Sequence, residues 1–459
     1  MPTAMERNVT RNLGVMVFGR KRPGFDQEWS QAIWEHSLST LKAMGFTCIG
    51  ATTRVTDEET IHAALDEIEQ AKCVALVIVQ PSMSDGQFAF TVAQRWRDPV
   101  VLWTTPERPG NGKVSSCSLV GNNLWASILR QMHHPFELVY GGPEDKSGTM
   151  ESDLFRAIAL ASTVSRLRRA KVGVVGTHVP GFIDLAADPF LIQQTFGMQF
   201  HPLSLPQFIE RVGNLEEEAV GKDLIEVHKL GLTPTNQHPD EELAVNSRYF
   251  LAMKNLMQEM NLDALALQCW PELAAFLGQW PYLAVTRMTT AGKAVAIEGD
   301  VDGAIGSLMS CLLGFGPGFQ TDWLEHDAST IHFWHPGMAP LDMCYPLGGA
   351  EAPALAEHFN VVKPMVVEAK LRTGEPVTVS RLWRCDNRYH LTAFEGRSIE
   401  PKRRVTGNSL LMEVNGEPVP ERFDRMIHVG MPHHFTLHFG NYAETFRRLA
   451  RMLGVVWHG

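Results

Sequence analysis

Apolar runs the length of a β-strand alternate with amphipathic stretches the length of a helix through the first two thirds of the chain. Strand-like runs occur at 14–18, 73–79 and 99–103, and helical stretches at 27–43 and 57–71 separate the first two. This order is typical of βαβ units, in which helices cover both faces of a parallel sheet. It predicts an α/β fold with doubly wound parallel sheets.

A second set of these units follows in the middle of the chain. Strand-like runs at 171–176 and 263–267 accompany helical stretches at 205–225 and 240–260. A further helix over about 151–169 joins the two sets. Because the apolar spacing restarts after this helix, the sequence predicts a second α/β domain.

The pattern changes after about residue 328 to short β-rich runs separated by turn residues, before a terminal helix near 442–453. A chain of 459 residues that is 44% hydrophobic can form more than one core. We therefore predict three domains. They are an N-terminal α/β domain (1–168), a second α/β domain that carries acidic residues (169–327) and a β-rich C-terminal domain that carries a histidine pair (328–459).

Charge and cysteine content narrow the class of protein. A net charge of -10 argues against a nucleic-acid partner, which usually requires a dominant basic face, and favours a small-molecule ligand. The seven cysteines are scattered without a C-x-x-C pair, so neither a disulfide framework nor a zinc knuckle is indicated. With no signal-like N-terminal segment and no apolar run of about 18 residues, we expect a cytoplasmic protein without a membrane span.

The first candidate for chemistry is an apolar run, Ala294–Ile297, that leads directly into Glu298, Asp300 and Asp302. Carboxylates at the end of a strand lie where α/β proteins place ligands. Asp300 and Asp302 could equally cap the helical stretch that follows. Glu298 is harder to explain structurally, because an unpaired carboxylate at the end of an apolar run is costly to desolvate.

Two further candidates are Asp322, which is flanked by aromatic and apolar residues, and the pair His433 and His434 at the mouth of a probable strand. Asp322 alone is more often a turn residue. Neighbouring strand side chains face opposite ways, so we expect only one histidine of the pair to enter a site. Two carboxylates and one imidazole suit Mn²⁺ or Mg²⁺. Such an ion could polarise the carbonyl of an open-chain sugar, so that a carboxylate moves a proton between carbons 1 and 2.

Several motifs resemble, in order and spacing, those of the L-fucose/L-arabinose isomerase family, and the resemblance spans nearly the whole chain. Each motif is weak alone, but the ordered set is fairly specific. The motifs are Gly19-Arg20, Ser118–Asn122, Val179–Phe182, Cys269–Glu272, Ile297–Ala304, Thr321–Trp323, His335–Pro340 and Pro432–His434.

The resemblance implies a ketol isomerase of the fucose isomerase-like fold, with two α/β domains and a β-rich domain. It implies a homo-oligomer, a trimer or hexamer, with sites near subunit contacts, and a Mn²⁺-type ion for which Mg²⁺ or Co²⁺ could substitute. By matching positions, Glu298 and Asp322 are similar to the family's paired carboxylates, which bind the metal and transfer the proton. His434, in preference to His433, is similar to its imidazole ligand.

Looser similarity implies that Arg20, Gln268, Trp270 and His433 line the sugar pocket, although Trp270 could equally be a core residue. His335 is either a further ligand or substrate contact, as in the arabinose branch, or shapes the turn after it.

Departures from the family pattern leave the sugar open. Pro336-Gly337 replaces a Cys-Gly pair, and Leu119-Val-Gly replaces Leu-Cys-Gly. Pentoses, 6-deoxyhexoses and sulfonated hexoses such as sulfoquinovose all remain candidates. The basic cluster Arg20-Lys21-Arg22 would suit an anionic sugar, although solvated loop charge explains it too.

Two other functions are compatible with paired α/β domains. One is a non-catalytic sugar-binding or sensor protein, which the acidic and histidine motifs disfavour. The other is a nucleotide-dependent enzyme, suggested by the glycines of Val172–Gly181, whose G-x-x-G-x-x-x-x-G spacing is not a nucleotide fingerprint.

Overall fold

The structure is a computed structural model that describes residues 11–20, 25–110, 112–142, 145, 147–234, 238–361, 363–402 and 405–459. The chain divides into two compact units, Met1–Arg168 and Arg169–Gly459. In the described parts of both units, every helix is too short or too polar to cross a bilayer.

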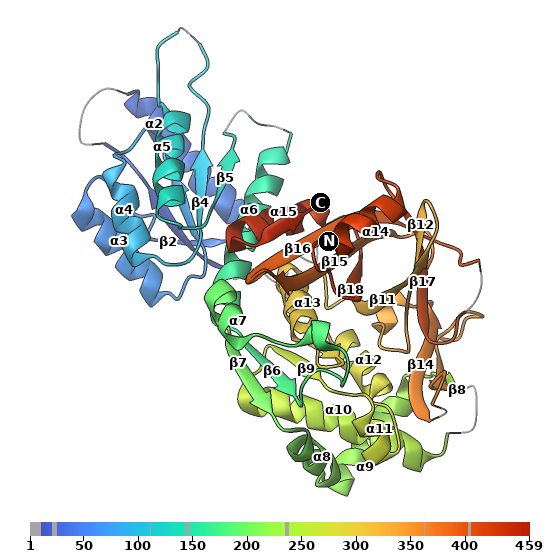
Figure 1. Ribbon diagram of the computed structural model, residues 1–459. Coiled ribbons are helices and arrows are strands. Elements are labelled where there is room, and N and C mark those ends of the chain that lie inside the picture. Colours follow the sequence, from blue (N-terminus) through green and yellow to red (C-terminus); the bar gives the residue numbers. More distant parts are fainter. Residues whose placement is uncertain are drawn as a thin grey trace. The chain divides into compact units, whose positions relative to one another are not determined.

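The first unit is a parallel sheet with the strand order β2-β1-β3-β4-β5 (Figure 1). Its central strands are almost fully buried, as the continuous apolar runs predict for a sheet covered on both faces. The strands are β1 (Asn12–Val17), β2 (Thr47–Ile49), β3 (Leu76–Val79), β4 (Val100–Thr104) and β5 (Phe136–Tyr140), and the helices are α2 (Gln27–Ala43), α3 (Glu58–Gln70), α4 (Gln87–Arg95), α5 (Ser118–Gln131) and α6 (Thr149–Leu167).

The second unit begins with a four-stranded parallel sheet of order β10-β9-β6-β7. Its strands are β6 (Lys171–Val175), β7 (Gln199–Leu203), β9 (Ala264–Leu267) and β10 (Ala294–Ile297). The helices around it are η1 (Ile183–Leu185), α7 (Pro189–Phe196), α8 (Leu205–Gly213), α9 (Glu217–Lys229), α10 (Asp240–Met260), α11 (Glu272–Leu277), α12 (Tyr282–Thr290) and α13 (Val301–Leu313).

The single helix expected over 205–225 is wrong, because the structure has two helices there, α8 and α9. Gly213 and Asn214 end α8, and both residue types favour helix termini over helix interiors.

The rest of the second unit is a ten-stranded, mainly antiparallel sheet of order β19-β16-β15-β18-β11-β12-β17-β14-β13-β8. Its strands are β8 (Thr233–Pro234), β11 (Phe319–His326), β12 (Thr330–His335), β13 (Ala354–Glu357), β14 (Pro364–Lys370), β15 (Pro376–Cys385), β16 (Arg388–Ile399), β17 (Asn408–Val414), β18 (His434–Phe439) and β19 (Val456–His458). The remaining helices are η2 (Leu341–Met343), α14 (Val419–Ile427) and α15 (Ala443–Leu453). Parallel α/β units followed by a strand-rich sheet confirm the predicted fold class.

One hydrophobic core joins the two sheets of the second unit. It contains Leu267 and Ile297 of the parallel sheet together with Phe319, Phe333 and Phe435 of the large sheet. Helix α13 contacts both sheets, since it packs on β9 and β10 and also on β15 and β18. The carboxyl ends of the parallel strands therefore face strands that come much later in the sequence.

A buried ion pair also stabilises the second unit. Both Nη atoms of Arg287 in α12 lie 2.7 Å from the carboxylate oxygens of Asp223 in α9, and both side chains are 8% exposed. Asp223→Ala is expected to lower the free energy of unfolding by about 3–5 kcal/mol, because it leaves the guanidinium buried without its partner. The exposed Lys222–Glu218 pair is the control, and Lys222→Ala should cost less than about 1 kcal/mol. Equal costs in urea-unfolding curves would contradict this prediction.

Candidate metal and substrate site

Glu298 lies at the carboxyl end of β10, where the backbone turns sharply into α13. Its φ is 60°, and that of Gly299 is 72°. A non-glycine residue held in this left-handed region costs about 1–3 kcal/mol, and such residues cluster at functional sites. The backbone carbonyl of Glu298 accepts a hydrogen bond from Val179 N at 3.1 Å, which ties the turn to the loop after β6. The turn therefore holds the Glu298 carboxylate in a fixed position.

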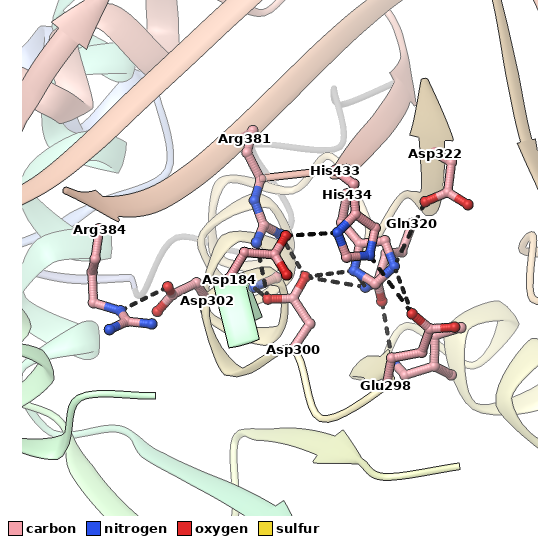
Figure 2. Close-up of polar contacts among 12 residues, drawn as sticks. Asp184, Glu298, Asp300, Asp302, Gln320, Asp322, Arg381, Arg384, His433 and His434 are labelled. Carbon is pink, nitrogen blue, oxygen red and sulfur yellow. Dashed lines mark hydrogen bonds and ion pairs between the residues drawn. The ribbon is translucent and has the colours of Figure 1, made fainter. Parts of the chain in front are cut away.

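Asp322 and His434 lie opposite each other on the neighbouring antiparallel strands β11 and β18. His434 is completely buried, and its Nε2 lies 3.2 Å from Glu298 Oε2 and 3.8 Å from Asp322 Oδ1 (Figure 2). The fold thus brings together the three residues that the sequence singled out as a metal site, although they come from three separate strands.

Both histidines of the pair approach Glu298, so the expectation that only one could enter the site is wrong. Nε2 of His433 lies 3.8 Å from Glu298 Oε2, and the two imidazole rings are 4.3 Å apart. The strand alternation does not separate these side chains, because His433 precedes the first residue of β18.

Each of the two imidazoles also contacts an aspartate through Nδ1. His433 Nδ1 lies 2.7 Å from Asp184 Oδ2 in η1, and His434 Nδ1 lies 3.0 Å from Asp300 Oδ2. A carboxylate at Nδ1 fixes the orientation of a metal-binding or catalytic imidazole. Both Nε2 atoms are consequently directed toward Glu298 (Figure 2).

The two aspartates of the glycine-rich turn have different roles. Asp300 caps α13, since its Oδ1 accepts a hydrogen bond from Gly303 N at 2.8 Å. Asp302 does not cap the helix; its carboxylate accepts hydrogen bonds from Arg384 Nε at 2.9 Å and Tyr389 Oη at 2.8 Å. Capping therefore explains only part of the acidic motif.

His335 lies on the other side of Glu298, with its Nε2 3.9 Å from Glu298 Oε1. Potential ligand atoms of Glu298, His335 and His434 lie within 4.8 Å of one another, and so do those of Asp322, His433 and His434. Both groups contain His434. The arrangement is compatible with a cation held by nitrogen and oxygen ligands.

Unpaired polar atoms at this position fit a cation. Among the described residues, the buried atoms Asp322 Oδ1, His433 Nε2 and His434 Nε2 have no hydrogen-bond partner, although Glu298 lies close to both imidazoles. Buried polar atoms are rarely left unpaired unless a water or an ion completes their coordination. Their convergence indicates that these side chains could hold a divalent ion.

The charges within the cluster of Glu298, Asp322, His335, His433 and His434 favour a bound cation. Burial opposes the ionisation of Glu298, but the imidazoles of His433 and His434 beside it hold its pKa well below the ordinary value. Burial also opposes protonation of His434, yet the neighbouring carboxylates of Asp300 and Glu298 raise its pKa to about 10. Burial lowers the pKa of His335 to about 3, so this imidazole is neutral and keeps a free lone pair. The carboxylates therefore create a potential that attracts a cation.

Comparisons with known proteins find similarity to sugar isomerases. The family described as fucose/sulfoquinovose isomerase, N-terminal domain, matches residues 14–168. A sulfoquinovose isomerase of Priestia aryabhattai is 28% identical over 450 residues, which is 97% of this chain and 98% of that relative. A sulfoquinovose isomerase of Priestia megaterium gives the same values. A third, from Alkalicoccus urumqiensis, is 25% identical over 406 residues, covering 87% of this chain and 89% of the relative. Residues 14–168 thus resemble a fucose/sulfoquinovose isomerase domain, and nearly the whole chain is similar to sulfoquinovose isomerases.

This similarity to fucose/sulfoquinovose isomerases confirms the resemblance inferred from the motifs. The matched domain ends at residue 168 and so coincides with the first unit, whereas the cluster around Glu298 lies in the second. The similarity to the Priestia proteins extends over 97% of the chain. The family model therefore does not cover the cluster, whereas the similarity to the Priestia proteins spans nearly the whole chain.

Gln268 follows β9 as Glu298 follows β10, and the two strands pair in parallel with Leu267 opposite Ile297. The two polar side chains therefore emerge at the same edge of the sheet. Gln268 is nearly buried, and its Oε1 accepts a hydrogen bond from Thr177 N at 2.8 Å. Its carbonyl thus supports the loop after β6.

Trp270 and Arg20 are the other two residues that were expected to line a sugar pocket. Trp270 is partly buried and packs against the main core, which agrees with the core alternative. Arg20 lies in the first unit, with its guanidinium 5.5 Å from the Phe25 ring centre. Lys21 and Arg22 lie outside the described residues. The contribution of Trp270 and Arg20 to a sugar pocket stays a prediction.

Three polar residues of the site were missed by the sequence reasoning: Asp184, Gln320 and Arg381. Gln320 Nε2 lies 2.7 Å from His434 Nδ1, and Arg381 binds Asp300 through both Nη atoms. Gln320 could have been found, because it precedes Asp322 by two residues and strand alternation puts both on one face. Arg381 lies in β15 among mixed polar and apolar residues, and Asp184 lies in the short helix η1, so neither had a comparable pattern.

Gly299→Ala tests the turn that holds Glu298. An added Cβ would lie 2.1 Å from Thr177 O, whereas at Gly316, whose φ is 77°, no described atom lies within 4 Å. Left-handed backbone costs alanine about 1–2 kcal/mol at either position. We expect Gly299→Ala to destabilise the protein more than Gly316→Ala in urea unfolding, because only the former adds a clash with backbone. Equal unfolding free energies for the two variants would show that the turn is not constrained as described.

Proposed function

We propose that the chain is a metal-dependent aldose–ketose isomerase, an intramolecular oxidoreductase, that acts on the sulfonated hexose sulfoquinovose. The observation that carries the proposal is the convergence of Glu298, Asp322 and His434, with unpaired ligand atoms directed at one point. The names of the relatives from Priestia and Alkalicoccus support the choice of sugar.

Mn²⁺ is the proposed cation, with Mg²⁺ or Co²⁺ as alternatives. Glu298, Asp322 and His434 would hold it, and His335 is close enough to Glu298 to be a further ligand. Carboxylate oxygens with one or two imidazoles suit these ions. When bound, such an ion polarises the sugar carbonyl and makes the neighbouring C–H bond more acidic.

The two carboxylates are the proposed proton carriers. Conversion of an aldose into its 2-ketose takes a proton from C2 and delivers one to C1 through an enediol, and a carboxylate beside the two carbons can do both. Glu298 is fixed for this by its turn, and Asp322 by its strand. Gln268, Trp270, His335 and His433 are proposed to bind the sugar, and Arg20 its sulfonate.

Proton exchange tests the reaction. Manganese-loaded protein is incubated in D₂O with sulfoquinovose, L-fucose or L-arabinose, and NMR follows deuterium at C2 of the aldose and the appearance of the ketose. We expect exchange and ketose with sulfoquinovose. Exchange only with one of the neutral sugars would overturn the substrate, and no exchange with any sugar would overturn the isomerase function.

A non-catalytic sugar-binding or sensor protein is the alternative from a different class. It would bind one of these sugars, as measured by calorimetry, without exchanging deuterium. The strained backbone at Glu298 and the unpaired histidine nitrogens favour the enzyme, because binding a neutral sugar requires neither.

The proposal also covers the oligomeric state of the protein, the domains of its second unit and its compartment. We propose a homo-oligomer, a trimer or hexamer, with sites near subunit contacts, in which 169–327 and 328–459 are domains of the second unit. Light scattering on the purified protein would measure its mass. We place it in the cytoplasm, which agrees with the seven cysteines, all of them described and none in a disulfide.

A further inference from the structure

Asp300 is a completely buried carboxylate whose two oxygens are both occupied. Oδ1 accepts hydrogen bonds from Gly303 N at 2.8 Å and from Arg381 Nη2 at 3.1 Å. Oδ2 lies 2.5 Å from Arg381 Nη1, 3.2 Å from Gln320 Nε2 and 3.0 Å from His434 Nδ1. The bidentate guanidinium and the helix N-terminus thus fix this carboxylate in one orientation (Figure 2).

His434 could carry its proton on either ring nitrogen, and Gln320 and Asp300, which both contact Nδ1, favour different tautomers. Gln320 Nε2 lies 2.7 Å from Nδ1, and donation from this amide would leave the proton of the imidazole on Nε2. An ionised Asp300 can only accept, so it requires the proton on Nδ1. Hydrogen bonds to an ionised group are roughly twice as strong as those between neutral groups, so the carboxylate should prevail.

We propose that Asp300, clamped by Arg381, is a positioning residue that keeps the proton of His434 on Nδ1 and so presents the Nε2 lone pair to the cation. This inference rests on the proposed metal site, and it adds a role for two buried residues that do not face the ion. The neighbouring Asp302 has no part in it, because its carboxylate pairs with Arg384 and Tyr389.

Substitution of Gly303 can disturb the contact between Asp300 and Arg381, here called the clamp, without changing a proposed metal ligand. A Cβ at this position would lie 2.4 Å from Asp300 Oδ2 and 3.2 Å from Arg381 Nη1, so only glycine permits the pair to form as observed. Gly306 lies in the same helix, and there an added Cβ would have Leu382 Cβ as its nearest neighbour at an ordinary 3.8 Å. Gly303→Ala and Gly306→Ala are therefore a matched test and control.

The first experiment measures the Mn²⁺ dissociation constant of the full chain from the electron paramagnetic resonance of the free ion. Asp300→Asn and Gly303→Ala are expected to raise it about 10- to 100-fold, the usual effect of losing a group that orients a metal ligand. Gly306→Ala and Asp302→Asn should bind Mn²⁺ as the unchanged protein does. Unchanged affinity in folded Gly303→Ala and Asp300→Asn, or an equal loss in Asp302→Asn, would overturn the proposal.

The second experiment needs no variant of the clamp. In magnesium-loaded protein labelled with ¹⁵N-histidine, the resonances of His434, assigned by their absence in His434→Gln, report which nitrogen carries the proton. Protonated Nδ1 with unprotonated Nε2 is expected. The opposite tautomer would overturn the role of Asp300 even if Asp300→Asn and Gly303→Ala failed to fold.

His434→Gln separates this inference from the proposed function. If it binds Mn²⁺ as tightly as the unchanged protein, the metal site is wrong and the inference falls with it. If it loses affinity while Gly303→Ala and Asp300→Asn do not, the metal site stands and only the positioning role is wrong.

Discussion

Glu298→Gln is expected to lower kcat/KM for isomerisation by about 10³–10⁴-fold, because the change removes both a proposed metal ligand and a proposed proton carrier. The amide has nearly the same shape as the carboxylate, so the turn at the end of β10 should persist. The measurement is the initial rate of ketose formation at saturating Mn²⁺, together with the circular dichroism spectrum of the variant.

The control for Glu298→Gln is Glu325→Gln. Glu325 lies on β11, the strand of Asp322, but its side chain is 49% exposed and faces His332. The same loss of charge there should leave the rate unchanged. A folded Glu298→Gln variant that still forms ketose at the normal rate would refute the assignment of this carboxylate.

Much of the parallel-sheet part of the site could be predicted from the sequence. Glu298 and Gln268 each follow a short apolar run, and a single rule, that polar residues at carboxyl ends of parallel strands form ligand sites, places both at one edge. The rule works because parallel strands share a direction, so their ends coincide without knowledge of the tertiary packing.

The other half of the site depends on pairing that the sequence does not encode locally. Asp322 and His434 face each other because β11 pairs with β18, and these strands are far apart in the chain. Their ligand chemistry and the family resemblance suggested that they meet, but no local pattern did. His433 shows the limit of local rules, since alternation along a strand fails for a residue that precedes the strand.

Asp300 could not be assigned from sequence because two explanations are true at once. It caps α13, as the pattern suggests, and the same carboxylate also contacts His434 and Arg381. A cap is a local property that spacing predicts, whereas the contacts with β15 and β18 depend on how α13 packs between the sheets.

Removal of the metal is expected to abolish isomerisation reversibly. Protein stripped with EDTA should show no ketose formation, and Mn²⁺ should restore the full rate, because the proposed mechanism relies on the divalent ion to polarise the sugar carbonyl. The rate is measured before stripping, after dialysis and after addition of Mn²⁺, Mg²⁺ or Co²⁺, which also orders the three candidate ions.

The stripped protein should nevertheless stay folded. His434 is held by Asp300, His433 by Asp184 and Glu298 by its turn, and the core beneath them consists of apolar side chains. Adding Mn²⁺ at 100 times its dissociation constant should therefore raise an existing stability by about 2.7 kcal/mol rather than drive folding, and Glu298→Gln should lose most of that increase. Full activity in the EDTA-stripped protein would contradict a catalytic ion, whereas unfolding on stripping would show that the cluster needs the ion to form.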